Sequence, residues 1–177
     1  MTTTAKPCSD AGPTPKIPTR GQDPASHPLD NPAYASLSGH HAHLAERRGN
    51  AVRYPAEVSP FIALPEIPDP QDWADLAALV GPGAIVPLVG AGDPPDGWEV
   101  AFLGAGVQLV DEGVVAVPDG EAIRLTPADV PEMLALIDRT KPGPFLSRTI
   151  ELGTYLGIRR DGELIAMAGI FVPHQLR

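Results

Sequence analysis

The amino-acid sequence predicts a mixed α/β (α+β) fold, in which helices flank a mixed sheet. The first observation is an amphipathic helix signal after Thr126-Pro127, where apolar residues recur at helical spacing. The second is Asp161-Gly162 between two strand-like runs, because both positions of a two-residue hairpin turn need a positive φ. The third is the alternation of helix and strand patterns over residues 31–112, which is typical of layered α/β architectures.

The helix after Thr126 has two candidate starts. Asp129 with Glu132 has the spacing of a capping box, in which a carboxylate accepts the free N–H groups of the first turn. Thr126 with Asp129 has the same spacing and is a competing start. We prefer Asp129, because Pro131 then lies in the first turn, where its missing N–H costs nothing. The helix is expected to end at residues 141–144, and its apolar stripe consists of Val130, Met133, Leu134 and Ile137.

Strand-like runs surround this helix and the Asp161-Gly162 turn. Residues 122–125 form a short apolar run before the helix, and residues 155–160 and 163–168 lie on either side of the turn. The predicted order over this stretch is therefore strand, helix, irregular or helical link, strand, turn and strand.

Residues 31–112 contain two further helix signals. Asn31-Pro32 is a cap followed by proline at the first helical position, and Gly49-Asn50 is expected to close this helix. Asp69-Pro70-x-Asp72 begins a second helix, which Gly81-Pro82-Gly83 ends. Short apolar runs predict strands at residues 52–54, 59–64, 84–89, 98–103 and 107–110.

Composition and charge narrow the function classes. The chain is 43% hydrophobic and 20% charged, as in globular proteins. Residues 1–30 are rich in proline and polar residues, so we expect a disordered tail; Cys8, the one cysteine, lies in it, so no internal disulfide can form. The formal net charge of −9 disfavours nucleic-acid and anionic-membrane partners. Neither a membrane span nor a secretory signal is evident, so we expect a cytoplasmic protein.

Three histidines, His40, His41 and His43, raise the question of a metal site. Zinc sites usually combine histidine with cysteine or a carboxylate at a characteristic spacing. No cysteine or acidic residue stands at such a spacing here. We therefore expect no metal at these residues, and expect His41 to pack against the apolar stripe of the first helix.

The stretch of residues 122–169 resembles the opening half of a GNAT-type N-acetyltransferase core, of the acyl-CoA N-acyltransferase superfamily. Residues 140–153 are similar to one bacterial branch with an extra N-terminal region, often labelled FR47-like. The resemblance covers roughly residues 30–169. It implies a GNAT-like mixed sheet with flanking helices, and acetyl transfer from acetyl-CoA to a small-molecule or peptide amine. The segments that carry it are residues 123–125, 127–133, 154–158 and 161–169.

The sequence departs from the family after the third strand of the core. In the family, a fourth strand leads to an Arg/Gln-x-x-Gly-x-Gly/Ala loop that opens a helix and holds the pyrophosphate of acetyl-CoA on backbone N–H groups. That pattern does not occur in these 177 residues. The resemblance thus implies a core truncated after its third strand, inactive alone, that binds no cofactor tightly. The expected divisions are a tail (1–30), an N-terminal α/β region (31–112), a linker (113–120), the first half of the core (121–169) and an atypical C-terminal tail (170–177).

An alternative interpretation is a non-catalytic binding module that completes its sheet against a partner chain. An open sheet edge exposes unpaired backbone groups, so homo-oligomers or aggregates are also possible outcomes. A family pattern downstream of the gene segment would favour the enzyme, and its absence would favour the module.

Within the resemblance, the candidate site residues lie on the substrate side. Glu151 is the candidate catalytic base, and Phe145, Arg148 and Tyr155 are candidates for substrate binding. Phe145 follows a Pro-Gly-Pro turn, where an apolar side chain can form the wall of a pocket. Arg148 and Glu151 are three residues apart and can pair with each other or face a substrate. The competing interpretation is a solvated Arg148–Glu151 pair with Phe145 in the core.

Overall fold

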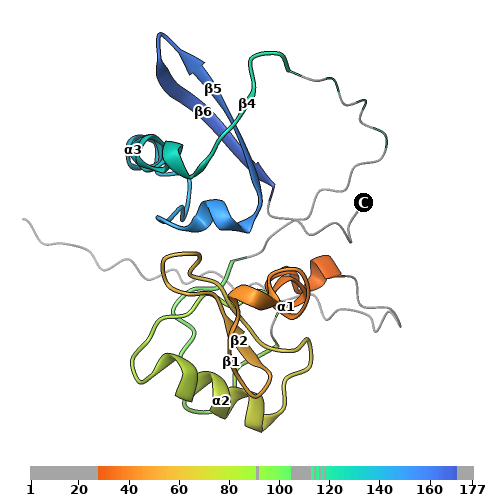
Figure 1. Cartoon of the computed structure of the whole chain (residues 1–177). Coiled ribbons are helices and arrows are strands. Elements are labelled where there is room, and N and C mark those ends of the chain that lie inside the picture. Colours follow the sequence, from red (N-terminus) through yellow and green to blue (C-terminus); the bar gives the residue numbers. More distant parts are fainter. Residues whose placement is uncertain are drawn as a thin grey trace, which may run out of the picture.

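The computed structural model describes residues 28–90, 92–104, 113, 115, 117 and 119–170. Within them, the chain forms two three-stranded antiparallel sheets, each with helices packed against it (Figure 1). The predicted strand at 107–110, and most of the two predicted tails, lie outside the described residues.

The first sheet lies between two helices. Its strands β1 (Glu46–Arg48), β2 (Ala51–Arg53) and β3 (Ile62–Ala63) run in the order β1-β2-β3. Successive side chains of a strand point to opposite faces. One face of the sheet therefore packs against α1 (Pro32–Ser38), after a 3-10 turn η1 (Pro28–Asp30), and the other packs against α2 (Pro70–Val80). The core against α1 contains Leu37, Val52, Tyr54, Val58 and Ala63, and the core against α2 contains Ala51, Ile62, Leu64, Trp73 and Leu76.

The first helix begins as predicted and ends earlier. The side chain of Asn31 accepts a hydrogen bond from the Tyr34 N–H at 3.3 Å, so Asn31 is its cap. The helix stops at Ser38, because the following glycine has low helix propensity. Residues 42–44 form the 3-10 turn η2 (Ala42–Leu44). Gly49-Asn50, predicted to close the helix, instead joins β1 to β2, with Gly49 at φ +53°.

The second helix matches its prediction. The carboxylate of Asp69 accepts a hydrogen bond from the Asp72 N–H at 2.9 Å, and the Asp72 carboxylate accepts one from the Asp69 N–H at 3.0 Å. This reciprocal capping box satisfies two first-turn donors at once. The helix ends before Gly81, whose φ of +82° suits glycine.

Two predicted strands are wrong. Residues 84–89 and 98–103 form no strand, apart from a single parallel bridge between Ile62 and Leu88. Their side chains do not form buried faces: Ile85 is 88% exposed and Phe102 is 86% exposed. Pro87 interrupts the first region and removes a backbone donor that a ladder needs, and Pro94 and Pro95 lie shortly before the second region.

The second sheet contains the predicted hairpin. Strands β4 (Ile123–Arg124), β5 (Thr154–Arg160) and β6 (Glu163–Ile170) run in the order β4-β5-β6. Asp161 and Gly162 join β5 to β6 at φ +52° and +84°, as a type I′ turn requires. One face packs against α3 (Val130–Thr140), and the predicted stripe of α3 contributes to that core. The buried members of this core are Leu125, Met133, Leu136, Phe145, Tyr155 and Leu164.

The capping box before α3 is the competing one, between Thr126 and Asp129. Thr126 and Asp129 form the capping box, and the Asp129 carboxylate accepts from both the N–H and the hydroxyl of Thr126 at 2.8 Å. A 3-10 turn, η3 (Pro127–Asp129), then leads into the helix. The α-helix itself begins after Asp129, with Pro131 in its first turn as predicted. Asp129 has helical dihedrals and makes no side-chain cap, so the predicted Asp129–Glu132 capping box is wrong.

A 3-10 helix joins the two halves. This segment, η4 (Thr149–Leu152), precedes β5 and contacts the first sheet's core through Leu152. The Thr149 hydroxyl donates to the Val58 carbonyl at 2.7 Å, and the Arg148 N–H donates to the Glu57 carbonyl at 2.9 Å. The second half is thereby fixed to the first by contacts that span about half of the chain.

Candidate functional site

The four predicted site residues divide between core and surface. Phe145 and Tyr155 are buried at 8% and 9% exposure, and their rings meet edge to face with centroids 5.4 Å apart. Arg148 and Glu151 are exposed beside η4. The structure thus forms two pairs rather than one cluster, and the aromatic pair faces the α3 core.

Arg148 and Glu151 form a two-pronged ion pair. The Nε and Nη2 atoms of Arg148 donate to the two carboxylate oxygens of Glu151 at 2.7 and 2.8 Å. These bonds hold the pKa of Glu151 below its usual range, against a smaller opposing effect of burial. A carboxylate with a lowered pKa is a weaker proton acceptor near neutral pH. In this geometry the arginine engages both oxygens of Glu151 and makes it a weaker base than a free carboxylate.

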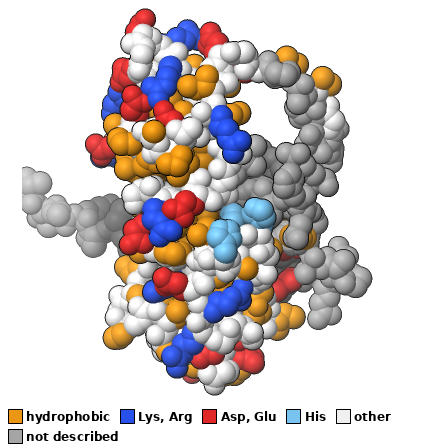
Figure 2. All heavy atoms as spheres, in the orientation of Figure 1, with side chains coloured by type: hydrophobic (Ala, Val, Ile, Leu, Met, Phe, Trp, Pro, Cys, Tyr) orange, Lys and Arg blue, Asp and Glu red, His pale blue; other side chains and the backbone are white. Residues whose placement is uncertain are grey.

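Exposed histidines lie near this ion pair. His43 is close enough to Glu151 for its charge to favour the carboxylate form and lower the pKa of Glu151 further. On the face shown in Figure 2, histidine side chains are exposed near the middle of the molecule, beside clustered acidic and basic side chains. Among the described residues, no group of three or more histidine, cysteine or acidic residues is arranged to hold a metal ion.

The ring of Tyr155 lies against the backbone of β6. A Cβ atom on Gly169 would come within 2.3 Å of the tyrosine Cε1, so only glycine leaves room for the ring at this position. Burial raises the pKa of Tyr155, so its phenol stays neutral. Tyr155 is placed as a core residue whose position depends on a glycine in the neighbouring strand.

The junction between the halves contains a buried polar group that the sequence did not indicate. His41 is 2% exposed; its Nδ1 lies 2.9 Å from the Tyr54 hydroxyl and its Nε2 lies 3.0 Å from the Leu152 carbonyl oxygen. Burial lowers the pKa of His41 and raises that of Tyr54. The expectation that His41 packs with the first helix's apolar residues accounts for its burial, but not for these bonds.

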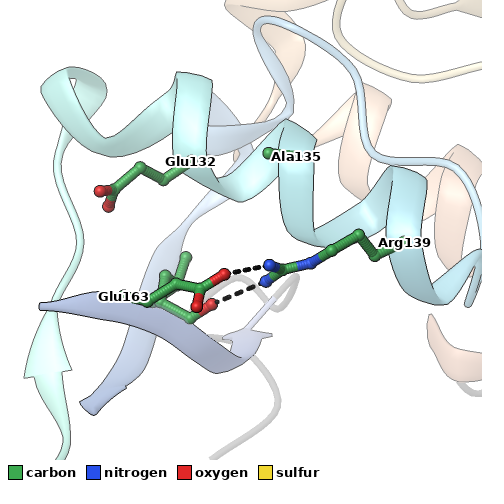
Figure 3. Close-up of a pocket in the computed structure, with 5 residues that line it drawn as sticks. Glu132, Ala135, Arg139 and Glu163 are labelled. Atoms are coloured by element: carbon green, nitrogen blue, oxygen red, sulfur yellow. Dashed lines mark hydrogen bonds and ion pairs between the residues drawn. The ribbon is translucent and has the colours of Figure 1, made fainter. Parts of the chain in front are cut away.

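A shallow depression of about 130 Å³ lies between α3 and β6 (Figure 3). Arg139 makes an ion pair with Glu163 there and donates to the Leu164 carbonyl at 3.2 Å. Glu132, on the rim, pairs with Arg159 at 2.5 Å, and Arg159 also contacts Asp129 at 2.6 Å. Each of these charged side chains already has a partner of opposite charge. The depression is therefore lined by ion pairs, one of which, Arg139–Glu163, joins α3 to β6. The lining residues are Glu132, Ala135, Arg139, Glu163 and Leu164.

Comparison with known proteins finds similarity to a solved structure. No protein-family model matches the chain, and no curated protein matches its sequence. A solved structure matches with a TM-score of 0.66 and 35% sequence identity over 81% of this chain. It is the 1.80 Å crystal structure of a protein from Novosphingobium aromaticivorans, assigned there as an acetyltransferase of the GNAT family. The fold is GNAT-like.

The GNAT-like fold confirms the predicted fold class, with helices packed against antiparallel sheets. The present chain spans 64% of the length of the Novosphingobium protein. Among the described residues, no helix is both long and apolar enough to cross a membrane.

Proposed function

We propose that this chain belongs to a GNAT-family N-acetyltransferase, in its FR47-like branch, and acts on a small-molecule or peptide amine in the cytoplasm. The observation that carries the proposal is the 35% identity to a GNAT-assigned structure over 81% of the chain. The capped helix α3 packed on the β5–β6 hairpin adds support, because these are the elements that carry the sequence resemblance.

The proposed reaction transfers an acetyl group from acetyl-CoA to the amine. The amine nitrogen forms a bond to the thioester carbonyl carbon, the carbon–sulfur bond breaks, and the thiolate leaves with CoA. A base takes the proton that the nitrogen loses. On this chain we assign the amine side to Glu151 as base and to Arg148, Phe145 and Tyr155 for substrate binding.

These 177 residues alone are expected to bind acetyl-CoA weakly, because they contain no Arg/Gln-x-x-Gly-x-Gly/Ala pattern to hold the pyrophosphate. Calorimetric titration at millimolar acetyl-CoA measures this directly, with the Novosphingobium protein as the positive control. Saturable one-to-one binding in the micromolar range would contradict the expectation.

The gene provides the test of the family assignment. The nucleotide sequence downstream should encode the pyrophosphate pattern in one of its reading frames. A polypeptide extended to include it should release CoA thiol in the presence of amines, and Glu151→Gln should slow that release. A downstream region without the pattern would contradict the proposal.

An alternative proposal is a binding module that completes its sheet with a partner chain. It is favoured by β6, whose sole strand partner among the described residues is β5. Residues 164–169 of β6 contain neither a charge nor a proline, the two features that commonly protect edge strands.

A further inference from the structure

Three Asp-Gly pairs occur in the sequence, and the structure holds each of them in a different way. They are Asp96-Gly97, Asp119-Gly120 and Asp161-Gly162, and all of these residues are exposed. An Asp-Gly pair can rearrange without a catalyst, because glycine has no Cβ to hinder a reaction at its backbone nitrogen. The turn around each pair therefore decides whether the rearrangement can begin in the folded chain.

The rearrangement consumes and releases only water. The backbone nitrogen of the glycine forms a bond to the side-chain carboxyl carbon of the aspartate, and the carboxyl hydroxyl leaves as water with the amide proton. Water then opens the resulting succinimide ring at either of its carbonyl groups. One opening restores aspartate. The other gives isoaspartate, in which the main chain runs through the side-chain carboxyl carbon and is longer by one carbon.

The hairpin restrains Asp161-Gly162. Arg160 and Glu163 are paired across β5 and β6, so the ladder holds the main chain on both sides of the turn. Closing the ring requires the main chain of Asp161 to rotate out of its type I′ geometry, which separates this end of the hairpin. The pair can therefore react only after a local opening of the sheet, which costs free energy.

Hydrogen bonds restrain Asp119-Gly120. The Oδ1 atom of Asp119 accepts from the Glu121 N–H at 2.9 Å, and its backbone carbonyl accepts from the Ala122 N–H at 3.3 Å. The first of these bonds is an Asx turn, in which an aspartate side chain bonds the backbone two residues on. Turning the carboxyl group toward the nitrogen of Gly120 gives up this bond.

Neither restraint is present at Asp96-Gly97. Residues 92–104 contain no helix or strand, and the Asp96 carboxylate has no hydrogen-bond or ion-pair partner among the described residues. The turn is closed by a bond from the Trp98 N–H to the Pro95 carbonyl at 3.3 Å, longer than the usual distance of about 2.9–3.0 Å. No atom lies within 4 Å of the place where a Cβ of Gly97 would be, so the approach to this residue is open.

We propose that Asp96-Gly97 is a site of spontaneous isoaspartate formation in the folded chain. The proposal goes beyond acetyl transfer and does not depend on it. The product reaches the core against α2, because the ring of Trp98 meets that of Trp73 with centroids 5.5 Å apart, and an added main-chain carbon directly before Trp98 displaces its ring. Isoaspartate also has a free α-carboxyl group, which isoaspartyl-specific protein methyltransferases modify with S-adenosylmethionine. An enzyme of that class is the partner that fits this site.

The test is a comparison of the full 177-residue chain aged near neutral pH in the folded state and in concentrated urea. Peptide mapping by liquid chromatography and mass spectrometry separates the aspartyl and isoaspartyl forms at each pair. In urea the pairs should react at similar rates, because the turns are lost. In the folded chain, Asp119 and Asp161 should react several-fold more slowly than in urea, whereas Asp96 should keep most of its rate.

Asp96→Glu is the decisive variant, because the longer side chain cannot close the same ring and the exposed position keeps its charge. It should remove most of the methyl-acceptor sites that an isoaspartyl methyltransferase counts in the aged, folded chain, together with the slow change in tryptophan fluorescence. Asp161→Glu is the matched control and should leave both unchanged. A folded chain that reacts fastest at Asp119 or Asp161, or one in which folding slows Asp96 as much as the others, would overturn the proposal.

Discussion

At the scale of single residues, Gly162 is the position with the clearest backbone requirement. Its φ is +84°, and no atom lies within 4 Å of the place where a Cβ would be. Gly162→Val should therefore destabilise the fold by backbone strain alone, by about 1–2 kcal/mol. Chemical denaturation measures the change. Gly120→Val is the matched control, because Gly120 is equally open without a positive φ; an equal loss in both variants would show that the turn is not the cause.

Side-chain contacts near the candidate site differ in how far apart their partners lie in the sequence. The spacing of Arg148 and Glu151 indicates an ion pair, because residues three apart on a helical turn are neighbours. The roles of His41 and Arg159 depend on partners 111 and 30 residues away. No local pattern encodes such distances, so these contacts were not predictable from the sequence.

At the scale of elements, the capping box at the start of α3 is the feature to test. Thr126→Ala removes the hydroxyl of this box and should lower the free energy of unfolding by about 1 kcal/mol. Thr126→Ser keeps a hydroxyl and should retain most of the stability. Urea denaturation of the two variants at pH 7 provides the comparison, and equal midpoints would contradict the role of the cap.

The stabilisation that the Thr126–Asp129 capping box provides also depends on pH. The Thr126 N–H, then its hydroxyl and Arg159 hold the pKa of Asp129 below its ordinary value of 3.8. The folded state therefore favours the carboxylate form. Its stabilising contribution is present above pH 3.8 and is lost as the pH falls through the lowered pKa. In Thr126→Ala, the loss of stability on acidification should be smaller than in the wild-type chain.

Elements were predictable where their signals are local. The second helix and the β5–β6 hairpin each depend on residues within a few positions of one another. Residues 84–89 and 98–103 have the apolar character of strands, but a strand also needs a partner with free donors and acceptors. Nearby prolines lack the N–H group that a partner strand would bond. Strand propensity is a property of single residues and does not include the need for a partner.

At the scale of the whole molecule, Thr149 tests how far the contacts between η4 and the first sheet stabilise the fold. Its hydroxyl donates to the Val58 carbonyl at 2.7 Å and accepts from the Leu146 N–H at 2.8 Å, at 6% exposure. Thr149→Val removes both bonds at nearly constant volume and should cost about 1–3 kcal/mol. Thr149→Ser preserves them and is the control. Thermal denaturation should separate the two variants, and coincident curves would contradict the assignment.

One edge of β6 has no partner strand among the described residues, and this gives a prediction about association. Residues 164–169 are uncharged, and Ile165 is 46% exposed. The isolated 177-residue chain should dimerise or aggregate through this edge, because unpaired strand groups attract another strand. Light scattering over a concentration series measures the effect, and Ile165→Lys should reduce it. A chain that stays monomeric at high concentration, with slow hydrogen exchange along β6, would contradict this prediction.

The contacts between η4 and the first sheet join residues far apart in the sequence, and this has a consequence for the order of folding. The first sheet and its two helices come from residues 32–80, yet their core includes Leu152. On the ribosome, the first sheet therefore emerges about seventy residues before the segment that covers it, and domains generally fold as they emerge. Contacts between distant residues form late, because the chain must lose the entropy of closing a long loop before the contacts can stabilise it. The apolar surface around Leu37 and Val58 is thus transiently uncovered during translation, and the docking of η4 is the step that ends this exposure.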